Sequence, residues 1–577
     1  MKIYLLSLTS KRTGKEHPNV SRTKTIAIIP ARGGSKGIPR KNVRFLQGKP
    51  LISYTIRTAL KCRNIDTVIV STDDEEIAHI AEVTGCEVVM RPPHLADDHI
   101  PLDPVIHHAI SVIESEKNET FDVVVTLQPT SPLLSQSSVD KALDKFTTGN
   151  ADTIISVVDD RHLSWTKVDG KYVPLYEKRV NRQFLPANFR ETGGFVITRR
   201  RFVTDESRFG PDIDLFELPH TESIDIDSYM DWWLADKLLE RKRILIRTDG
   251  YREIGMGHVY RTLMLAAKLI DHELLFVTQK NHALGTDKIR DSHFKVTTFE
   301  TDDELNRILD QFSPHIVIND ILDTDKEYIN SLKQRGLFVV NFEDLGPGSD
   351  EAHVVINALY ETVPGKSNYF FGKNYYCLRD EFFLLHPKPI VEKVEDILIT
   401  FGGTDSHDYA PRVLSILDKM NLKDIQVTVV TGLGVRNIDA LKAHAAKLSL
   451  PVRILRDIRT ISKFMNEADI IFTSAGRTVY EAASLGTPTM VMAQNEREMT
   501  HTFACEENGI VHLGLGYELS DSRIEEELLR MINDVAFRRE MQKRMLGQNL
   551  KEGMDNVLKL IFETFEEYQK RDGNGTH

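Results

Sequence analysis

Short apolar runs alternate with longer amphipathic stretches from Ile26 to about Lys237. Four of the runs are rich in β-branched and aliphatic residues, which predicts strands at 67–70, 87–90, 123–127 and 153–157. Apolar positions recur at helical spacing over 51–62, 75–84 and 105–116. Strands that alternate with helices favour βαβ units and a mostly parallel sheet.

The same alternation starts again after a Trp-rich helical stretch near Asp231. A strand at 243–247 leads through a glycine loop into a helix, and further strands are predicted at 274–279, 315–320 and 337–342. A charged, Pro-containing stretch around 380–395 is typical of a linker, and a new strand and glycine loop, ILITFGGTDSH, follows it. Two successive units of this kind predict two Rossmann-like lobes that face each other across a cleft.

We therefore predict an α/β protein with a Rossmann-like first domain and a two-lobed second module. The predicted segments are an N-terminal extension without order (1–23), the first domain (24–240), the two lobes (243–390 and 394–548), and a C-terminal helix and tail (549–577).

Composition limits the function. The 577 residues are 41% hydrophobic and 27% charged, as in ordinary globular proteins, and the net charge of −12 argues against nucleic-acid binding. Four scattered cysteines without metal-binding spacing suggest reduced thiols in a cytoplasmic protein. No apolar run is long enough to cross a membrane, and the first ten residues lack the cleavage site of a signal peptide.

The most informative segment is IAIIPARGGSKGIPRKN, residues 26–42. An apolar strand ends at Pro30, and the loop after it interleaves glycines with Arg and Lys. Glycines allow the backbone N–H groups to approach an anion closely, and the cations add charge for a triphosphate. The loop lacks the Walker spacing, so the residues alone leave open an ordinary basic loop.

A second group of charges lies in SIDIDS, which contains Asp225 and Asp227. On an extended strand, alternate side chains share one face, so the two carboxylates would point the same way. Carboxylate oxygens suit Mg²⁺, which neutralises charge during phosphoryl chemistry. An exposed strand with outward acidic residues is the alternative.

Across residues 24–238 these features resemble the nonulosonate (sialic-acid type) cytidylyltransferases, which join CMP to an acidic sugar. The ordered motifs are the basic loop, Ser71–Thr72–Asp73, Arg91–Pro92, LQPTSP at 127–132, Arg182 with Arg190, and Asp225–Ile226–Asp227.

The resemblance implies roles for individual residues. CTP would be bound by the loop and by one arginine beyond it: Arg32, Gly33, Ser35, Lys36, Asn42 and Arg91, with Lys36 also catalytic. Gln128 and Arg190 would hold the nonulosonate, and Asp225 and Asp227 would bind Mg²⁺. The segment with His99, Pro101 and Asp103, and the string ETGGFVI, differ from the family pattern, so the particular nonulosonate stays open.

In the second module, GMGHVYR places Gly255, Gly257 and His258 in the loop that opens a helix. Such a loop offers backbone N–H groups to an anion, and an imidazole there can activate water. A capping or packed histidine is the alternative. Two further small-residue loops, Gly402–Asp405 and Ser474–Gly476, follow strands, and Glu481 lies on the next helix.

These strings resemble the UDP-sugar hydrolases of pseudaminic acid synthesis and the related spore-coat polysaccharide proteins, which have a two-lobed glycosyltransferase-B fold. The resemblance covers about 243–520 and includes NFED at 341–344, VVINA, LRDEF and TSAGRTVYEA. It implies that His258 is the base that activates water. The residues implied to contact the UDP-sugar are Gly257, Gly403, Thr404, Ser474 and Glu481.

One departure limits this resemblance: the relatives have a DHYG-like string where this chain reads NDILDTD, without the tyrosine. Sugar transfer to an acceptor and non-catalytic nucleotide-sugar binding therefore stay as alternatives. The expected partners are CTP, a nonulosonic acid and a UDP-sugar, with no nucleic acid and no membrane insertion. The first resemblance also implies a homo-oligomer, a dimer through the first domain.

Overall fold

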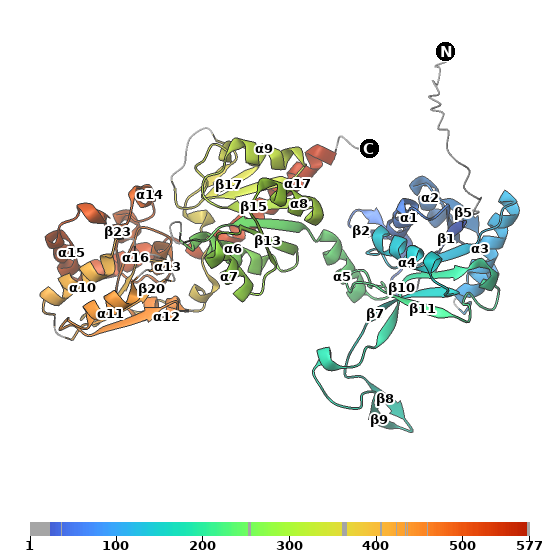
Figure 1. The fold of residues 1–577 in the computed structure, drawn as a ribbon, viewed down its shortest axis with the longest axis horizontal. Coiled ribbons are helices and arrows are strands. Elements are labelled where there is room, and N and C mark those ends of the chain that lie inside the picture. The colour runs from blue at the N-terminus through green and yellow to red at the C-terminus, as the bar shows by residue number, and fades with distance from the viewer. Residues whose placement is uncertain are drawn as a thin grey trace, which may run out of the picture. The chain divides into compact units, whose positions relative to one another are not determined.

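The computed structural model describes residues 23–573 except 36, 98, 252–254, 361–365, 404, 406, 423, 433, 436 and 459. Two compact units meet in sequence at Arg241 and Lys242. Each unit has its own sheets (Figure 1).

The first unit is built on a seven-stranded sheet in the order β11-β7-β10-β6-β1-β4-β5. β10 runs antiparallel to both of its neighbours, and the other pairs are parallel. The strands are β1 (Thr25–Pro30), β4 (Thr67–Thr72), β5 (Glu87–Met90), β6 (Val123–Leu127), β7 (Thr153–Asp159), β10 (Phe189–Arg199) and β11 (Ile213–Glu217). The strands predicted in this region and the mostly parallel sheet are therefore confirmed.

Helices cover both faces of this sheet. One face packs against apolar residues of α1 (Leu51–Lys61), α2 (Glu75–Thr84) and α4 (Gln136–Thr148). The other packs against α3 (Leu102–Lys117). Because both faces are covered, β1 is buried at every position, which is why its residues 26–29 appear as a continuous apolar run in the sequence.

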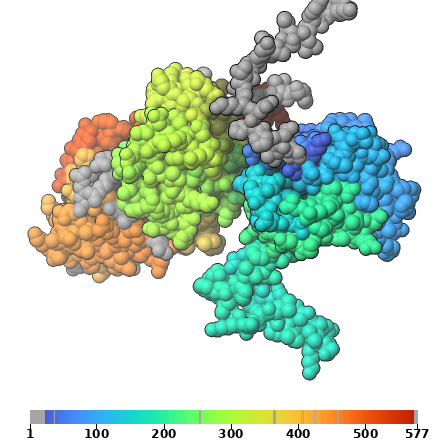
Figure 2. Space-filling view, turned by 45° about the vertical axis from the view of Figure 1, so that its right-hand side comes forward, coloured from blue at the N-terminus to red at the C-terminus, as the bar shows by residue number. Residues whose placement is uncertain are grey.

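A hairpin of β8 (Trp165–Val168) and β9 (Lys171–Pro174) projects from the first unit (Figures 1 and 2). Asp169 and Gly170 form its turn with positive φ of 50° and 81°, as an Asp-Gly hairpin requires. Its apolar side chains Trp165, Val168 and Tyr172 are more than half exposed. We call β8, β9 and their turn the arm.

The prediction of a strand through Asp225 and Asp227 is wrong. Residues 223–227 lie in no strand and lead into α5 (Tyr229–Glu240), whose N-terminus is closed by a capping box of Ser228 and Asp231. Ile226 alone is fully buried, in a small cluster with Ile38 and Leu46. Burial of Ile226, rather than strand alternation, therefore sets the directions of the two aspartates.

The second unit contains two fully parallel sheets, as predicted. The first lobe has the order β14-β13-β12-β15-β16-β17-β18. Its strands are β12 (Arg243–Thr248), β13 (Glu273–Gln279), β14 (Val296–Phe299), β15 (Ile316–Asp320), β16 (Phe338–Phe342), β17 (Val354–Asn357) and β18 (Tyr369–Phe371). α6 (Gly257–Lys268) and α7 (Ala283–Asp291) pack on one face, and α8 (Asp302–Phe312) and α9 (Lys326–Gln334) on the other.

The second lobe has the order β21-β20-β19-β22-β23-β24. Its strands are β19 (Asp396–Thr400), β20 (Gln426–Thr431), β21 (Val452–Arg456), β22 (Ile470–Thr473), β23 (Thr489–Ala493) and β24 (Ile510–Leu515). Its helices are α10 (Tyr409–Lys419), α11 (Ile438–Ala445), α12 (Ile461–Glu467), α13 (Thr478–Leu485), α14 (Glu496–Met499), α15 (Asp521–Asn533) and α16 (Val535–Leu546).

The last helix, α17 (Gly553–Gly573), belongs to the core of the first lobe rather than to a tail. Its residues Val557, Ile561 and Phe565 are buried with residues of β12, β15 and β16 (Figure 1). The chain thus returns from the second lobe to complete the first. Among the described helices, none is long and apolar enough to span a bilayer.

Candidate functional sites

The basic loop follows β1 in the first unit and is packed closely against the end of β4. The Gly33 N–H donates to Asp73 Oδ1 at 3.2 Å, and a Cβ on Gly33 would lie 2.5 Å from Asp74 Oδ2. A side chain there would therefore displace the loop. Asn42 is buried and donates from Nδ2 to the Arg32 carbonyl at 3.0 Å, which ties the two ends of the loop together. Lys36 lies outside the described residues, and Ser35 is part of this loop.

The structure brings the acidic segment to the same loop through Asp227 and the Ile226 carbonyl. A Cβ on Gly37 would lie 2.6 Å from the Asp227 carbonyl oxygen, and Lys41 Nζ lies 3.2 Å from Asp227 Oδ1. Lys41 also donates to the Ile226 carbonyl. The basic loop and the acidic segment are thus neighbours, although nearly two hundred residues separate them in the sequence.

The two aspartates differ in environment. Asp227 is exposed, whereas Asp225 is partly buried with its Oδ1 lacking a hydrogen-bond partner among the described residues. Burial raises the pKa of Asp225, and the nearby charge of Asp227 adds to the effect. A buried carboxylate oxygen without a protein partner is where a divalent cation would stabilise the charge, so these residues fit a magnesium ion.

Arg91 lies at the same edge of the sheet. Its guanidinium donates to the Ser71 carbonyl at the end of β4, and its Nε is buried without a described partner. Burial lowers the pKa of Arg91 to about 10, while Asp73 opposes the shift and Arg32 adds to it. Arg32, Asp73 and Arg91 therefore form one group of interacting charges beside the basic loop.

The two residues implied to hold the sugar are placed differently. Gln128 is half-buried directly after β6, next to the basic loop's own strand β1, and its carbonyl accepts from Thr55 Oγ1 at 3.2 Å. Arg190 is exposed on β10 and donates from Nε to Asp160 Oδ2 at 3.2 Å. The described contacts of Arg190 thus join it to the end of β7 and not to the basic loop.

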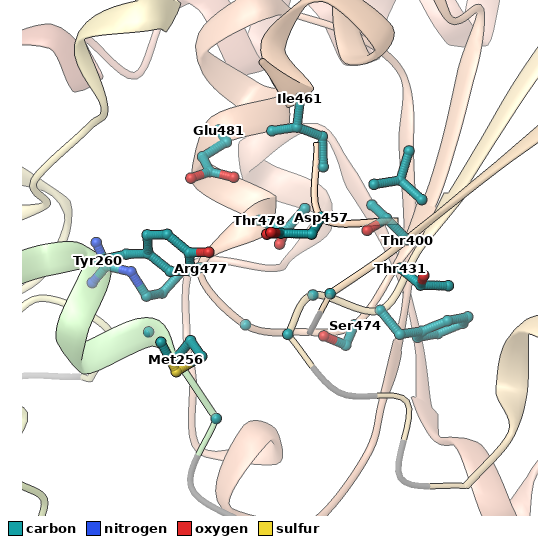
Figure 3. Close-up of a pocket in the computed structure, with 18 of the residues that line it drawn as sticks. Met256, Tyr260, Thr400, Thr431, Asp457, Ile461, Ser474, Arg477, Thr478 and Glu481 are labelled. Carbon is teal, nitrogen blue, oxygen red and sulfur yellow. The ribbon is translucent and has the colours of Figure 1, made fainter. Parts of the chain in front are cut away.

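The second unit contains a cavity of about 300 Å³ between the two lobes (Figure 3). It is lined by four of the predicted ligand-binding residues, Gly257, Gly403, Ser474 and Glu481. Thr404 lies outside the described residues. The loops after β12, β19, β20, β21 and β22 all contribute to this lining, so the cavity lies at the carboxyl ends of parallel strands, where α/β proteins bind ligands.

Glu481 faces the cavity from α13, but it is not isolated there. Its Oε1 accepts from Arg379 Nε at 2.8 Å, and Arg379 also lies 2.9 Å from Glu381. Burial would lower the pKa of Arg379, but the two carboxylates raise it above its usual value. A charged pair therefore stands at one end of the cavity, with Tyr260 and Asp457 also in its wall (Figure 3).

His258 lies at the start of α6, beside this cavity but not in its lining. Its Nδ1 is 2.5 Å from Asp320 Oδ1, at the carboxyl end of β15. Arg261 donates to the same carboxylate from Nε at 2.6 Å and from Nη2 at 2.5 Å. Burial alone would raise the pKa of Asp320, but Arg261 and His258 lower it to about 2. Asp320 is thus an ionised partner that fixes the orientation of the imidazole.

Sequence reasoning missed Asp320 and Arg261. Arg261 could have been found, because it lies three residues after His258 on the same helical face, whereas Asp320 reaches His258 only through the pairing of β15 with β12. The segment NDILDTD lacks the tyrosine expected from the resemblance, but its first aspartate, Asp320, pairs with His258.

Family models match a part of each unit. Residues 26–175 match the family described as cytidylyltransferase, and residues 397–558 match the glycosyltransferase family 28 C-terminal domain. The chain belongs to the cytidylyltransferase family through its first unit, and its second unit is glycosyltransferase-B-like.

Among the relatives is a pseudaminic acid cytidylyltransferase of Campylobacter jejuni, 32% identical over 216 residues that cover 36% of this chain and 93% of the relative. An uncharacterized protein of Methanocaldococcus jannaschii is 30% identical over 273 residues, and the match spans 44% of this chain and about half, 56%, of that protein. The crystal structure of MurG from Acinetobacter baumannii aligns with a TM-score of 0.41 and 16% identity, over 55% of this chain and 99% of that one.

Proposed function

We propose that the first unit transfers CMP from CTP to a nonulosonic acid and releases pyrophosphate. A hydroxyl of the sugar would attack the α-phosphorus, the bond to the β-phosphate oxygen would break, and pyrophosphate would leave with that electron pair. The closeness of the basic loop to Asp227 and the acidic segment carries this proposal, because a triphosphate and a divalent cation need adjacent positive and negative groups.

In this proposal Arg32, Gly33, Ser35, Lys36, Asn42 and Arg91 bind CTP, and Gln128 and Arg190 bind the sugar acid. Asp225 and Asp227 would hold Mg²⁺, which when bound would neutralise charge on the phosphates. The name of the C. jejuni relative supports a pseudaminic-type substrate.

The test is pyrophosphate release from CTP with a panel of nonulosonic acids. Asp225→Ala and Asp227→Ala should each lower the rate by about 100-fold or more, because a catalytic cation contributes several kcal/mol to the transition state. Full activity of both variants with Mg²⁺ would contradict the metal assignment, and no release with any nonulosonic acid would contradict the proposed substrate class.

For the second unit we propose cleavage of a UDP-linked diacetamido-trideoxy sugar. His258 would accept a proton from water as the water oxygen bonds to the anomeric carbon, and UDP would leave with the electrons of the broken C–O bond. The pair of His258 with Asp320 supports this role, because an ionised partner at Nδ1 leaves Nε2 as the base. Gly257, Gly403, Thr404, Ser474 and Glu481 would contact the UDP portion.

A second candidate is sugar transfer to an acceptor hydroxyl, and the match of residues 397–558 to glycosyltransferase family 28 favours it. UDP release from a UDP-sugar in buffer alone, lost in His258→Ala, would support hydrolysis. Release that begins only when an acceptor is added would support transfer, and binding of UDP without turnover would support a non-catalytic module.

We also propose that the chain forms a homodimer through its first unit. The arm supports this, because its exposed Trp165, Val168 and Tyr172 are an apolar surface that a second copy would cover. Sedimentation should show a dimer that Tyr172→Ser with Trp165→Ser weakens. A monomeric wild-type chain at micromolar concentration would contradict this proposal.

A further inference from the structure

Glu343, in the string NFED, has no role in the reaction described above, yet its environment is unusual. It follows β16 directly, is 3% exposed, and has a left-handed backbone with φ of 50°. A non-glycine residue in this conformation costs free energy, and such strain is kept mainly where the surrounding structure requires a particular side-chain position.

The carboxylate of Glu343 is only partly satisfied. Its Oε1 accepts from Arg261 Nη1 at 3.1 Å, whereas its Oε2 is buried without a hydrogen-bond partner among the described residues. Burial raises the pKa of Glu343, while Arg261 and Arg477 oppose the rise. Two buried carboxylates, Glu343 and Asp320, thus share the single guanidinium of Arg261.

Arg477 connects this group to the cavity. It lines the cavity just before α13, and its guanidinium extends toward the first lobe beside Met256 and Tyr260 (Figure 3). Its Nη2 donates to the Cys377 carbonyl at 3.2 Å, and its Nη1 is buried without a described partner. Charges of opposite sign therefore follow one another from the cavity wall to the imidazole: Arg477, Glu343, Arg261, Asp320 and His258.

In the series from Arg477 to Asp320, two guanidinium groups alternate with two carboxylates. When Glu343 is ionised, these four charges balance while His258 is neutral. Without the charge of Glu343, the cluster would already be positive before His258 gained a proton, and protonation would be harder. The remaining titratable or charged groups near Glu343 are Tyr360, Cys377, Tyr480 and Arg497, and the guanidinium of Arg497 donates to the Glu343 carbonyl at 3.2 Å.

We propose that Glu343 is a positioning residue whose buried charge, acting through Arg261, sets the pH at which His258 becomes a base. Its side chain is buried and does not line the cavity, so it would act through Arg261 and not on a ligand directly. This inference rests on the proposed role of His258, but it concerns the protonation of the imidazole and not the identity of the sugar.

The experiment follows deuterium exchange at the imidazole Cε1–H of His258 in the full chain, by mass spectrometry of the peptide, as a function of pH. Exchange reports the protonation of that histidine without any substrate. Glu343→Gln should move the midpoint roughly one pH unit lower, the size expected for one charge at this range in a protein interior. Glu327→Gln, the same change at an exposed position of α9, is the control and should leave the midpoint unchanged.

Glu343→Asp separates charge from packing. It retains the negative charge, so its midpoint should lie within about 0.3 pH unit of the wild type, well inside the roughly one-unit shift expected for the loss of one charge. An unchanged midpoint in Glu343→Gln would overturn the proposal, and so would a full one-unit fall in Glu343→Asp. If the Gln variant does not fold, a full one-unit fall in Glu343→Asp still overturns the proposal.

The same variants separate this inference from the proposed activity. If the wild type releases UDP, the acid limb of its kcat/KM profile should fall by the same interval in Glu343→Gln. If no UDP-sugar is cleaved, the proposed reaction fails, while the exchange midpoints still test the role of Glu343.

Discussion

At the scale of single residues, Asp320, at the end of β15, fixes the orientation and the tautomer of His258. The carboxylate is fully buried and held by Arg261, so it stays ionised and accepts the Nδ1–H of His258. The tautomer with an available Nε2 follows from this contact. A buried ion pair is weak evidence for stability, so we assign the pair of Asp320 and Arg261 the role of orienting the imidazole of His258.

Asp320→Asn tests this directly. An amide can donate to Nδ1 and hold the wrong tautomer, so UDP release should fall about 10²- to 10⁴-fold. UDP binding should be retained, because Asp320 does not line the cavity. Kinetics combined with calorimetry of UDP would measure both, and Asp310→Asn, an exposed acid of the same lobe, is the matched control. Equal kcat in both variants would contradict the role of Asp320.

We expect the Asp225 carboxylate to lower the stability of the first unit at neutral pH while it serves the proposed metal site. Its pKa is raised in the folded state by burial, so the folded protein binds the extra proton. Stability is then lost as pH rises from the ordinary carboxyl range through the raised value. Asp225→Asn should remove this loss and melt higher than the wild type at neutral pH in a metal chelator.

The measurement is thermal melting of the first unit's transition, identified by its shift with CTP, between pH 4 and pH 8. Added Mg²⁺ should raise the melting temperature of the wild type and not that of Asp225→Asn. A variant that melts lower than the wild type at every pH would show that the carboxylate has a protein partner instead.

At the scale of elements, small apolar groups set the geometry of both sites. Ile226 is anchored with Ile38 and Leu46, so burial of one isoleucine holds the acidic segment beside the basic loop. In the second unit, α17 completes the face of the first lobe that also packs against α6, the helix of His258. Each site therefore depends on packing by a segment distant in sequence.

The packing of α17 can be measured. Phe565 is 2% exposed and its ring centroid lies 5.4 Å from that of Phe338 on β16. Phe565→Ala should destabilise the first lobe by about 3–5 kcal/mol, as large-to-small core substitutions do. Denaturant unfolding would detect the loss, with Lys559→Ala on the exposed side of α17 as the control. A loss below 1 kcal/mol would mean that α17 is a dispensable tail.

At the scale of the whole molecule, the two units have separate cores and separate sites. The proposed products of one are not the substrates of the other: CMP transfer needs a nonulosonic acid, whereas UDP release gives a simpler sugar. We therefore expect a chain that combines two independent activities.

If the two activities are independent, each can be removed without the other. Asp227→Ala should abolish pyrophosphate release and leave UDP release within about twofold, since the two sites belong to units with separate cores and share no described partner residue. His258→Ala should do the reverse. Both rates would be measured on the same preparation, and a loss of both activities in either single variant would show coupling between the units.

The succession of short apolar runs and amphipathic stretches was enough to predict the strands at 67–70, 123–127 and 315–320 and the parallel character of the sheets, because a strand buried on both faces is largely apolar. The glycine loop at Gly33 was visible for a related reason, since the close approach of Asp74 leaves little room for a side chain there.

Other features followed only from the tertiary structure. The pair of His258 with Asp320, the sharing of Arg261 with Glu343, and the return of α17 to the first lobe join residues that are remote in sequence, and local periodicity contains no record of such distances. The direction of Asp225 was wrongly expected from strand alternation, because burial of Ile226 against a distant cluster decides it. Local chemistry thus specified the elements and their loops, and packing between distant segments decided which charges meet.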